Sequence, residues 1–151
     1  MNLRTIYFSA THTSERVAKA ISCAVADEFA VEDITFGELK NPDFEADDML
    51  LVAVPVYGGG VAPVALKRLE AMRGNNTLAV VVVVYGNRNF ERAATQMSDF
   101  LAERGFVTIA AAAFVGEHSY STDENPVAVG RPNDGDIAEA QRFGELIKVK
   151  M

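Results

Sequence analysis

The stretch Thr77–Tyr85, with the sequence TLAVVVVVY, decides the fold class. Most of its residues are β-branched and apolar without interruption, which predicts a strand that is covered on both faces. Met49–Val54 and Phe106–Val115 have the same character and predict two more buried strands. Leu3–Ser9 predicts a strand near the start of the chain, and Ala30–Phe36 predicts a strand at a sheet edge.

Helical patterns separate these strands. Apolar residues spaced by four, such as Val17, Ile21 and Val25, mark one buried face of the first helix. The predicted helices are Ser14–Phe29, Pro63 to about Gly74, Phe90–Arg104 and a last helix that Asp134, Gly135 and Asp136 open. Buried strands that alternate with helices predict an α/β sandwich of three layers around a five-stranded parallel sheet. In such a sheet a ligand binds beyond the carboxyl ends of the strands, so the loops after the first, third and fourth strands matter most.

Composition limits the class of function. The 151 residues predict one domain, and the net charge of −7 argues against nucleic acid and anionic membranes as partners. The single cysteine, Cys23, forms no internal disulfide and cannot hold an iron–sulfur cluster, which fits a reducing, cytoplasmic setting. No apolar run is long enough to span a membrane, and the start of the chain has no pattern of an export signal.

The first loop is rich in hydroxyl groups. Ser9, Thr11, Thr13 and Ser14 lie between a strand and a helix, with no lysine among them. A helix N-terminus offers unpaired N–H groups and a partial positive charge, so hydroxyls beside it predict a phosphate site. The simpler alternative, that a serine or threonine only caps the helix, explains one or two hydroxyls but not four in six residues.

The second loop, PVYGGGVAP at Pro55–Pro63, contains three consecutive glycines next to Tyr57. Glycines let a backbone approach a flat ligand closely, and Tyr57 supplies an aromatic face. The alternative is a tight turn between a strand and a helix, for which one glycine is enough.

The third loop, YGNRNFER at Tyr85–Arg92, offers the amides of Asn87 and Asn89. Phe90 faces either a ring or the core of the following helix, and by itself the second interpretation is stronger. Arg88 is more often a solvated surface charge than a ligand-binding group.

A long segment without period, Gly116–Gly135, holds His118, Tyr120 and Arg131. Loops of this length in compact domains are usually functional or mobile. No partner for a catalytic histidine is evident. The chain also lacks a G-x-S-x-G elbow, a metal-binding spacing and the G-K-[ST] of a nucleotide-hydrolysing loop.

SATHTS, PVYGGG and YGNRNF, in this order and spacing, resemble the three ligand-binding loops of flavodoxins. The likeness is strongest to the flavodoxin half of fusion proteins that carry a two-cluster ferredoxin behind it, in which VVYGNRNFERA, AAAFVGEHSYS and GRP have counterparts. No ferredoxin cysteines are present here. The resemblance implies a flavodoxin-like fold with strand order 2-1-3-4-5 and FMN as the cofactor.

The resemblance also implies a role for each matching residue. The hydroxyls of the first loop would hold the FMN phosphate, and Tyr57 and Phe90 would flank the isoalloxazine. Gly58 and Gly59 match the peptide that turns over when the flavin gains one electron. Asn87 falls where the backbone and side chain meet the polar edge of the ring, and its neighbours Gly86 and Arg88 are included in the predicted site. The predicted binding residues are Ser9, Thr11, His12, Thr13, Ser14, Pro55, Val56, Tyr57, Gly58, Gly59, Gly86, Asn87, Arg88 and Phe90.

His12 is a departure, because flavodoxins usually have glycine at this position. Either histidine bears a modest strain there or its imidazole adds a donor near the phosphate, while Glu15 nearby disfavours a bound dianion. The function implied is electron transfer between redox proteins, with a reductase as donor and a ferredoxin-like protein or an enzyme as acceptor. The alternatives are an FMN-dependent reductase, a redox helper of the NrdI kind, and a degenerate flavodoxin-like domain that binds no flavin.

Overall fold

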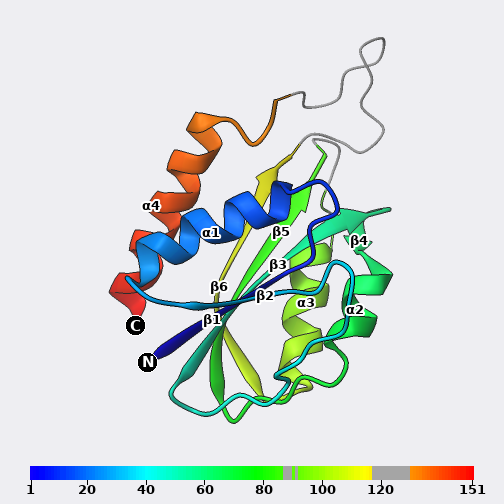
Figure 1. Ribbon diagram of the computed structural model, residues 1–151, viewed down its shortest axis with the longest axis vertical. Coiled ribbons are helices and arrows are strands. Elements are labelled where there is room, and N and C mark those ends of the chain that lie inside the picture. The colour runs from blue at the N-terminus through cyan, green and yellow to red at the C-terminus, as the bar shows by residue number, and fades with distance from the viewer. Residues whose placement is uncertain (87–89, 91, 117–129) are drawn as a thin grey trace.

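A computed structural model describes residues 1–86, 90, 92–116 and 130–151 (Figure 1). The strands are β1 (Asn2–Tyr7), β2 (Ala30–Asp33), β3 (Asp48–Tyr57), β4 (Gly60–Val61), β5 (Thr77–Tyr85) and β6 (Phe106–Val115). The helices are α1 (Thr13–Val25), α2 (Pro63–Leu69), α3 (Ala93–Ala102) and α4 (Asp134–Lys150). Within these described residues, no helix is both long and apolar enough to cross a membrane.

The long strands form one parallel sheet in the order β2-β1-β3-β5-β6. This confirms the predicted order 2-1-3-4-5, in which β5 and β6 are the fourth and fifth predicted strands. Helices α1 and α4 cover one face of the sheet, and α2 and α3 cover the other (Figure 1). The result is the predicted sandwich of three layers.

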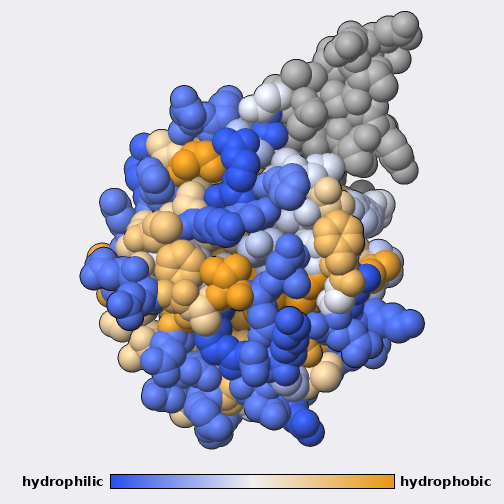
Figure 2. All heavy atoms as spheres, in the orientation of Figure 1, coloured by the Kyte–Doolittle hydropathy of each residue, from blue (hydrophilic) through white to orange (hydrophobic). Residues whose placement is uncertain are grey.

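The strand Thr77–Tyr85 explains why the core has two halves. Val80 and Val82 pack with α1 and α4, whereas Val81 and Val83 pack with α2 and α3. All four side chains are fully buried. Side chains on a strand point alternately to opposite faces, so an unbroken apolar run suits a strand between two helical layers. Figure 2 shows the outer surface in the same orientation as mostly hydrophilic, with apolar residues in separate groups.

Two predictions about strands are wrong. Pro55–Pro63 is not simply a loop: β3 continues to Tyr57, and β4 returns beside it as a short antiparallel partner. Gly58 and Gly59 form the turn with φ values of 63° and 82°, and two residues with positive φ fit a tight hairpin. Strand β6 is also less buried than predicted, because it lies at the edge of the sheet and most of its side chains are half-buried.

Element boundaries differ from the predicted ones by a few residues. Helix α1 ends at Val25 rather than Phe29, β2 ends at Asp33 rather than Phe36, and α3 begins at Ala93 rather than Phe90. Helix α4 begins at Asp134 as predicted. Asn133 caps it, because the Asn133 side chain accepts from the Asp136 backbone N–H while the Asp136 carboxylate accepts from the Asn133 N–H.

Candidate functional site

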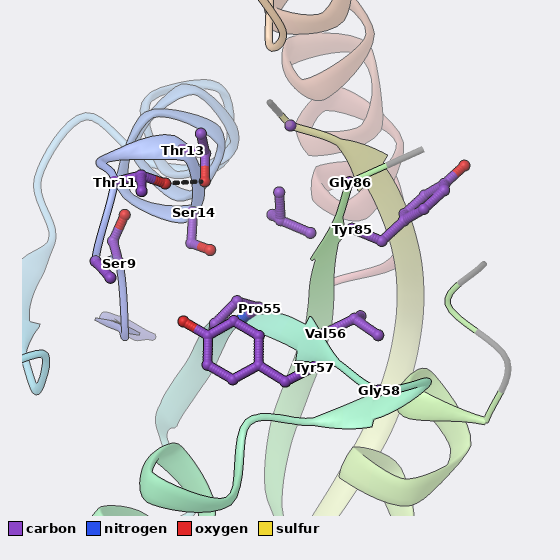
Figure 3. Close-up of a pocket in the computed structure, with 13 residues that line it drawn as sticks. Ser9, Thr11, Thr13, Ser14, Pro55, Val56, Tyr57, Gly58, Tyr85 and Gly86 are labelled. Atoms are coloured by element: carbon purple, nitrogen blue, oxygen red, sulfur yellow. Dashed lines mark hydrogen bonds between the residues drawn. The ribbon is translucent and has the colours of Figure 1, made fainter. Parts of the chain in front are cut away.

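A cavity of about 310 Å³ lies at the carboxyl ends of β1, β3 and β5 (Figure 3). Strands β2 and β3 pair with the two opposite edges of β1, so the strand order reverses at this point. The residues that line the cavity are Ser9, Ala10, Thr11, Thr13, Ser14, Pro55, Val56, Tyr57, Gly58, Val84, Tyr85, Gly86 and Gly116. The first and second predicted loops therefore meet at one cavity.

The loop between β1 and α1 forms the hydroxyl-rich wall. Thr13 and Ser14 are the first two residues of α1, and their backbone N–H groups donate to no other described residue. Thr11 Oγ1 lies 3.3 Å from Thr13 Oγ1. Ser9 Oγ accepts from the Glu15 backbone N–H at 3.0 Å, so one hydroxyl does cap the helix, as the simpler alternative held. Capping by Ser9 leaves the other three hydroxyls unexplained.

The hydroxyl of Ser14 indicates whether these residues could bind a phosphate. Its Oγ is buried, and it has no hydrogen-bond partner in the described part of the chain. Figure 3 shows this oxygen directed toward the cavity. A buried hydroxyl without a partner is costly, and a phosphate oxygen in the cavity would accept its proton. Together with the N–H groups of the first helical turn, this donor set fits a phosphate monoester and needs no lysine.

The described residues that line the cavity include no acidic and no basic side chain. The Glu15 carboxylate pairs with Lys19 Nζ at 2.6 Å and with His12 Nδ1 at 2.8 Å. These hydrogen bonds, that from Lys19 first, lower the pKa of Glu15 to about 2. The lowered pKa keeps Glu15 ionised, but the Lys19 ammonium offsets its negative charge, so the pairing reduces the predicted conflict between Glu15 and a dianion.

His12 adopts a left-handed backbone conformation at the position where flavodoxins usually have glycine. Its φ is 65°, and it occupies the position before the first residue of α1 without a side-chain cap. The imidazole is largely exposed and lies against Glu15, not along the cavity wall. In this arrangement the imidazole is not a donor to the cavity.

The end of β3 forms the aromatic wall. The Tyr57 ring lies at the cavity, below the hydroxyl groups in Figure 3, and is 47% exposed. Burial of its hydroxyl raises the pKa of Tyr57. Gly58 follows at the start of the hairpin turn, and Val61 N–H in β4 donates to Gln96 Oε1 of α3 at 2.8 Å. A bond to α3 thus holds the hairpin that carries Tyr57.

The end of β5 completes the cavity. Val84 and Gly86 line it, and the Tyr85 ring points away from Tyr57 (Figure 3). The Tyr85 ring packs against Phe90 with centroids 5.3 Å apart. Phe90, Gly59 and His12 are not among the lining residues, and Asn87 and Arg88 lie outside the described residues. His118 and Tyr120 lie outside them too.

Four lining residues, Ala10, Val84, Tyr85 and Gly116, are not among the binding residues predicted from the sequence. Gly116 is the most informative, because a Cβ atom there would lie 3.0 Å from Val84 Cγ1 and 3.1 Å from Thr13 Cβ. A lone glycine after a strand carries no signal of this approach, which only the pairing of β5 with β6 creates.

The residues described contain no group of three or more His, Cys, Asp or Glu side chains able to hold a metal ion. Arg131, in the long segment, forms a bidentate ion pair with Asp136, and its hydrogen bonds lower the pKa of that carboxyl. Both groups belong to the start of α4, so their visible role is to anchor the chain there.

Comparisons with known proteins agree with this geometry. A family profile for flavodoxins matches residues 6–143. Oxidised flavodoxin 2 from Bacillus cereus superposes with a TM-score of 0.71 at 15% identity, over 100% of both chains. A flavodoxin from the domain Archaea gives a TM-score of 0.68 at 16% identity, over 99% of this chain and 98% of that one.

The same fold occurs within a larger protein. Rubredoxin oxygen:oxidoreductase from Desulfovibrio gigas gives a TM-score of 0.61 at 16% identity, over 99% of this chain but only 35% of that one. No curated protein matches the sequence. The family profile covers most of the chain, and the chain therefore belongs to the flavodoxin family.

Proposed function

We propose that this protein binds FMN in the cavity between α1 and the end of β3 and carries electrons between redox proteins. The observation that carries the proposal is the buried Ser14 hydroxyl, which has no hydrogen-bond partner among the described residues. It lies beside the Thr13 and Ser14 N–H groups, which donate to none of those residues, and opposite the Tyr57 ring. A cavity with the hydroxyl-rich wall on one side and the aromatic wall on the other suits a ligand that has a phosphate at one end and a flat ring at the other.

Different residues would bind the phosphate and the ring system of FMN. The hydroxyls of Ser9, Thr11, Thr13 and Ser14 and the N–H groups of Thr13 and Ser14 would hold the phosphate. Tyr57 would cover one face of the ring system, and Gly58 would let the backbone approach its edge. When bound, the flavin ring supplies the redox chemistry, and the protein sets its potential through burial and hydrogen bonds.

The surface supports protein partners. The net charge of −7 favours docking to a basic patch on a partner. A reductase would supply the electrons, and a ferredoxin-like protein or an enzyme would accept them, in the cytoplasm. The likeness to the flavodoxin half of ferredoxin fusions makes an iron–sulfur protein the first acceptor to try.

A titration of the purified protein with FMN and with riboflavin tests this proposal. The phosphate site predicts tight FMN binding and weaker binding of riboflavin, which lacks the phosphate. Equal affinities for FMN and riboflavin would show that the loop before α1 does not bind the phosphate. No binding of either flavin would favour the alternative of a degenerate flavodoxin-like domain without a cofactor. Rapid oxidation of a nicotinamide cofactor by the FMN-loaded protein alone would favour a reductase over a carrier.

A further inference from the structure

We infer that Thr35, oriented by Asp33, is a positioning residue for the phosphate loop, and this inference rests on the proposed FMN site. Neither residue lines the cavity. Asp33 is the last residue of β2, the edge strand next to β1, and Thr35 lies two residues further on. Thr35 therefore contacts the phosphate loop from a neighbouring strand and not from within the loop.

Ser9 is held from two directions. Its backbone N–H donates to Thr35 Oγ1 at 2.9 Å, and its own Oγ accepts from the Glu15 N–H at 3.0 Å. Ser9 and Thr35 are each only 6% exposed. The first residue of the loop is therefore fixed between the end of β2 and the first turn of α1.

Asp33 determines which way the Thr35 hydroxyl points. Asp33 Oδ1 accepts from the Thr35 backbone N–H at 2.8 Å and also from the Thr35 hydroxyl. A carboxylate only accepts, so the single hydroxyl proton goes to Asp33 and the lone pairs remain for the Ser9 N–H. The order of donation runs from Ser9 to Thr35 to Asp33.

Arg68 of α2 holds the backbone on which this arrangement depends. Its guanidinium donates to the carbonyl oxygens of Ile34, at 2.6 Å, and of Thr35. It also lies over the Phe8 ring, 5.6 Å from the centroid. Thr35 is thus fixed by its hydroxyl, its N–H and its carbonyl.

The consequence for the ligand concerns the Ser9 hydroxyl. Because the Glu15 N–H already donates to Ser9 Oγ, the Ser9 proton is left for an acceptor at the cavity, and a phosphate monoester offers only acceptors when ionised. Fixing Ser9 through Thr35 presents that proton in one direction. The Tyr57 wall comes from β3 and does not depend on Thr35, so the effect is expected at the phosphate end of FMN alone.

The test compares T35V, which removes the hydroxyl, with T35S, which keeps it. We expect T35V to weaken FMN binding about tenfold, the effect of losing one hydrogen bond that orders a binding group, and to change riboflavin affinity less than about twofold. T35S is expected to bind FMN as the wild type does. The amide exchange rate of Ser9, measured by NMR without flavin, should rise in T35V and not in T35S.

T5V serves as the matched control, because Thr5 Oγ1 is buried and bonded to Ser22 Oγ at 2.7 Å, away from the loop. It should lower stability without changing the ratio of FMN to riboflavin affinity. Equal loss of both flavins in T35V would make Thr35 merely structural, and unchanged FMN affinity in T35V would also overturn the inference. A wild type that binds riboflavin and FMN alike would instead refute the proposed phosphate site itself.

Discussion

Replacing Ser14 by alanine should stabilise the flavin-free protein and weaken FMN binding. The Ser14 hydroxyl is buried and unpaired among the described residues. Removing a buried polar group without a partner relieves about 1–3 kcal/mol, and alanine also has the higher helix propensity. For a chain of this size each kcal/mol corresponds to about 2–4 °C in Tm.

The effect on FMN has the opposite sign. A hydrogen bond to a charged group contributes about 1.5–3 kcal/mol, which corresponds to a loss of affinity of about 10- to 100-fold for FMN in S14A. Riboflavin affinity should not change, because the missing hydroxyl faces the phosphate end. Fluorescence titration gives both affinities, and thermal unfolding of the flavin-free protein gives the stability.

Ser22 offers a control on the same helix. It is fully buried like Ser14, but its Oγ bonds to Thr5 Oγ1 at 2.7 Å and to the Ala18 carbonyl at 2.8 Å. S22A should therefore lower stability by about 1 kcal/mol and leave FMN affinity unchanged. If S14A destabilised the protein as S22A does, or bound FMN as tightly as the wild type, the assignment of Ser14 to the phosphate would be refuted.

Three further predictions concern conformation, packing and pH. H12G should be more stable than H12A by about 1 kcal/mol in chemical denaturation, because both lose the imidazole but only glycine adopts the left-handed φ of 65° without strain. Equal stabilities of the two variants would show that the backbone at this position is not strained. G144A should lower the free energy of unfolding by about 1–3 kcal/mol, because a Cβ there would lie 2.7 Å from the Ile21 carbonyl oxygen. G37A, where a Cβ meets nothing within 4 Å, should be neutral, and a similar loss in both variants would count against the close contact of α1 and α4. The pKa of Glu15 falls from 4.5 to about 2 on folding, so its pairing stabilises the protein above pH 4.5 and is lost as the pH falls toward 2. E15Q should therefore show a smaller drop in Tm than the wild type across that pH range. Parallel curves of Tm against pH for the two proteins would show that the pairing does not contribute.

Local patterns were enough to predict a parallel sheet between two helical layers and the loops that line much of the cavity, whereas the strand order came from the resemblance to flavodoxins. The unbroken apolar run of Thr77–Tyr85 specifies a strand buried on both faces, and the change from strand to helix after β1 identifies the hydroxyl-rich loop. Thr11, Thr13 and Ser14 do line the cavity with Tyr57 and Gly58, as the order of the loops suggested.

What the sequence did not reveal depends on contacts between distant segments. The β3–β4 hairpin requires two glycines in a turn and a hydrogen bond from Val61 N–H to Gln96 Oε1 of α3, and neither is visible as a strand pattern. The half-burial of β6 follows from its place at the sheet edge, not from its composition. Thr35 reaches Ser9 only because β2 pairs with β1, and the two residues are 26 positions apart.

The most direct test of the central claim is the visible absorption spectrum of the purified protein after addition of FMN and desalting. The proposed site predicts that flavin bands remain, at about one FMN per chain, and that S14A retains less. A colourless protein after desalting, together with no detectable affinity for FMN at high concentration, would contradict the claim that this cavity holds a flavin.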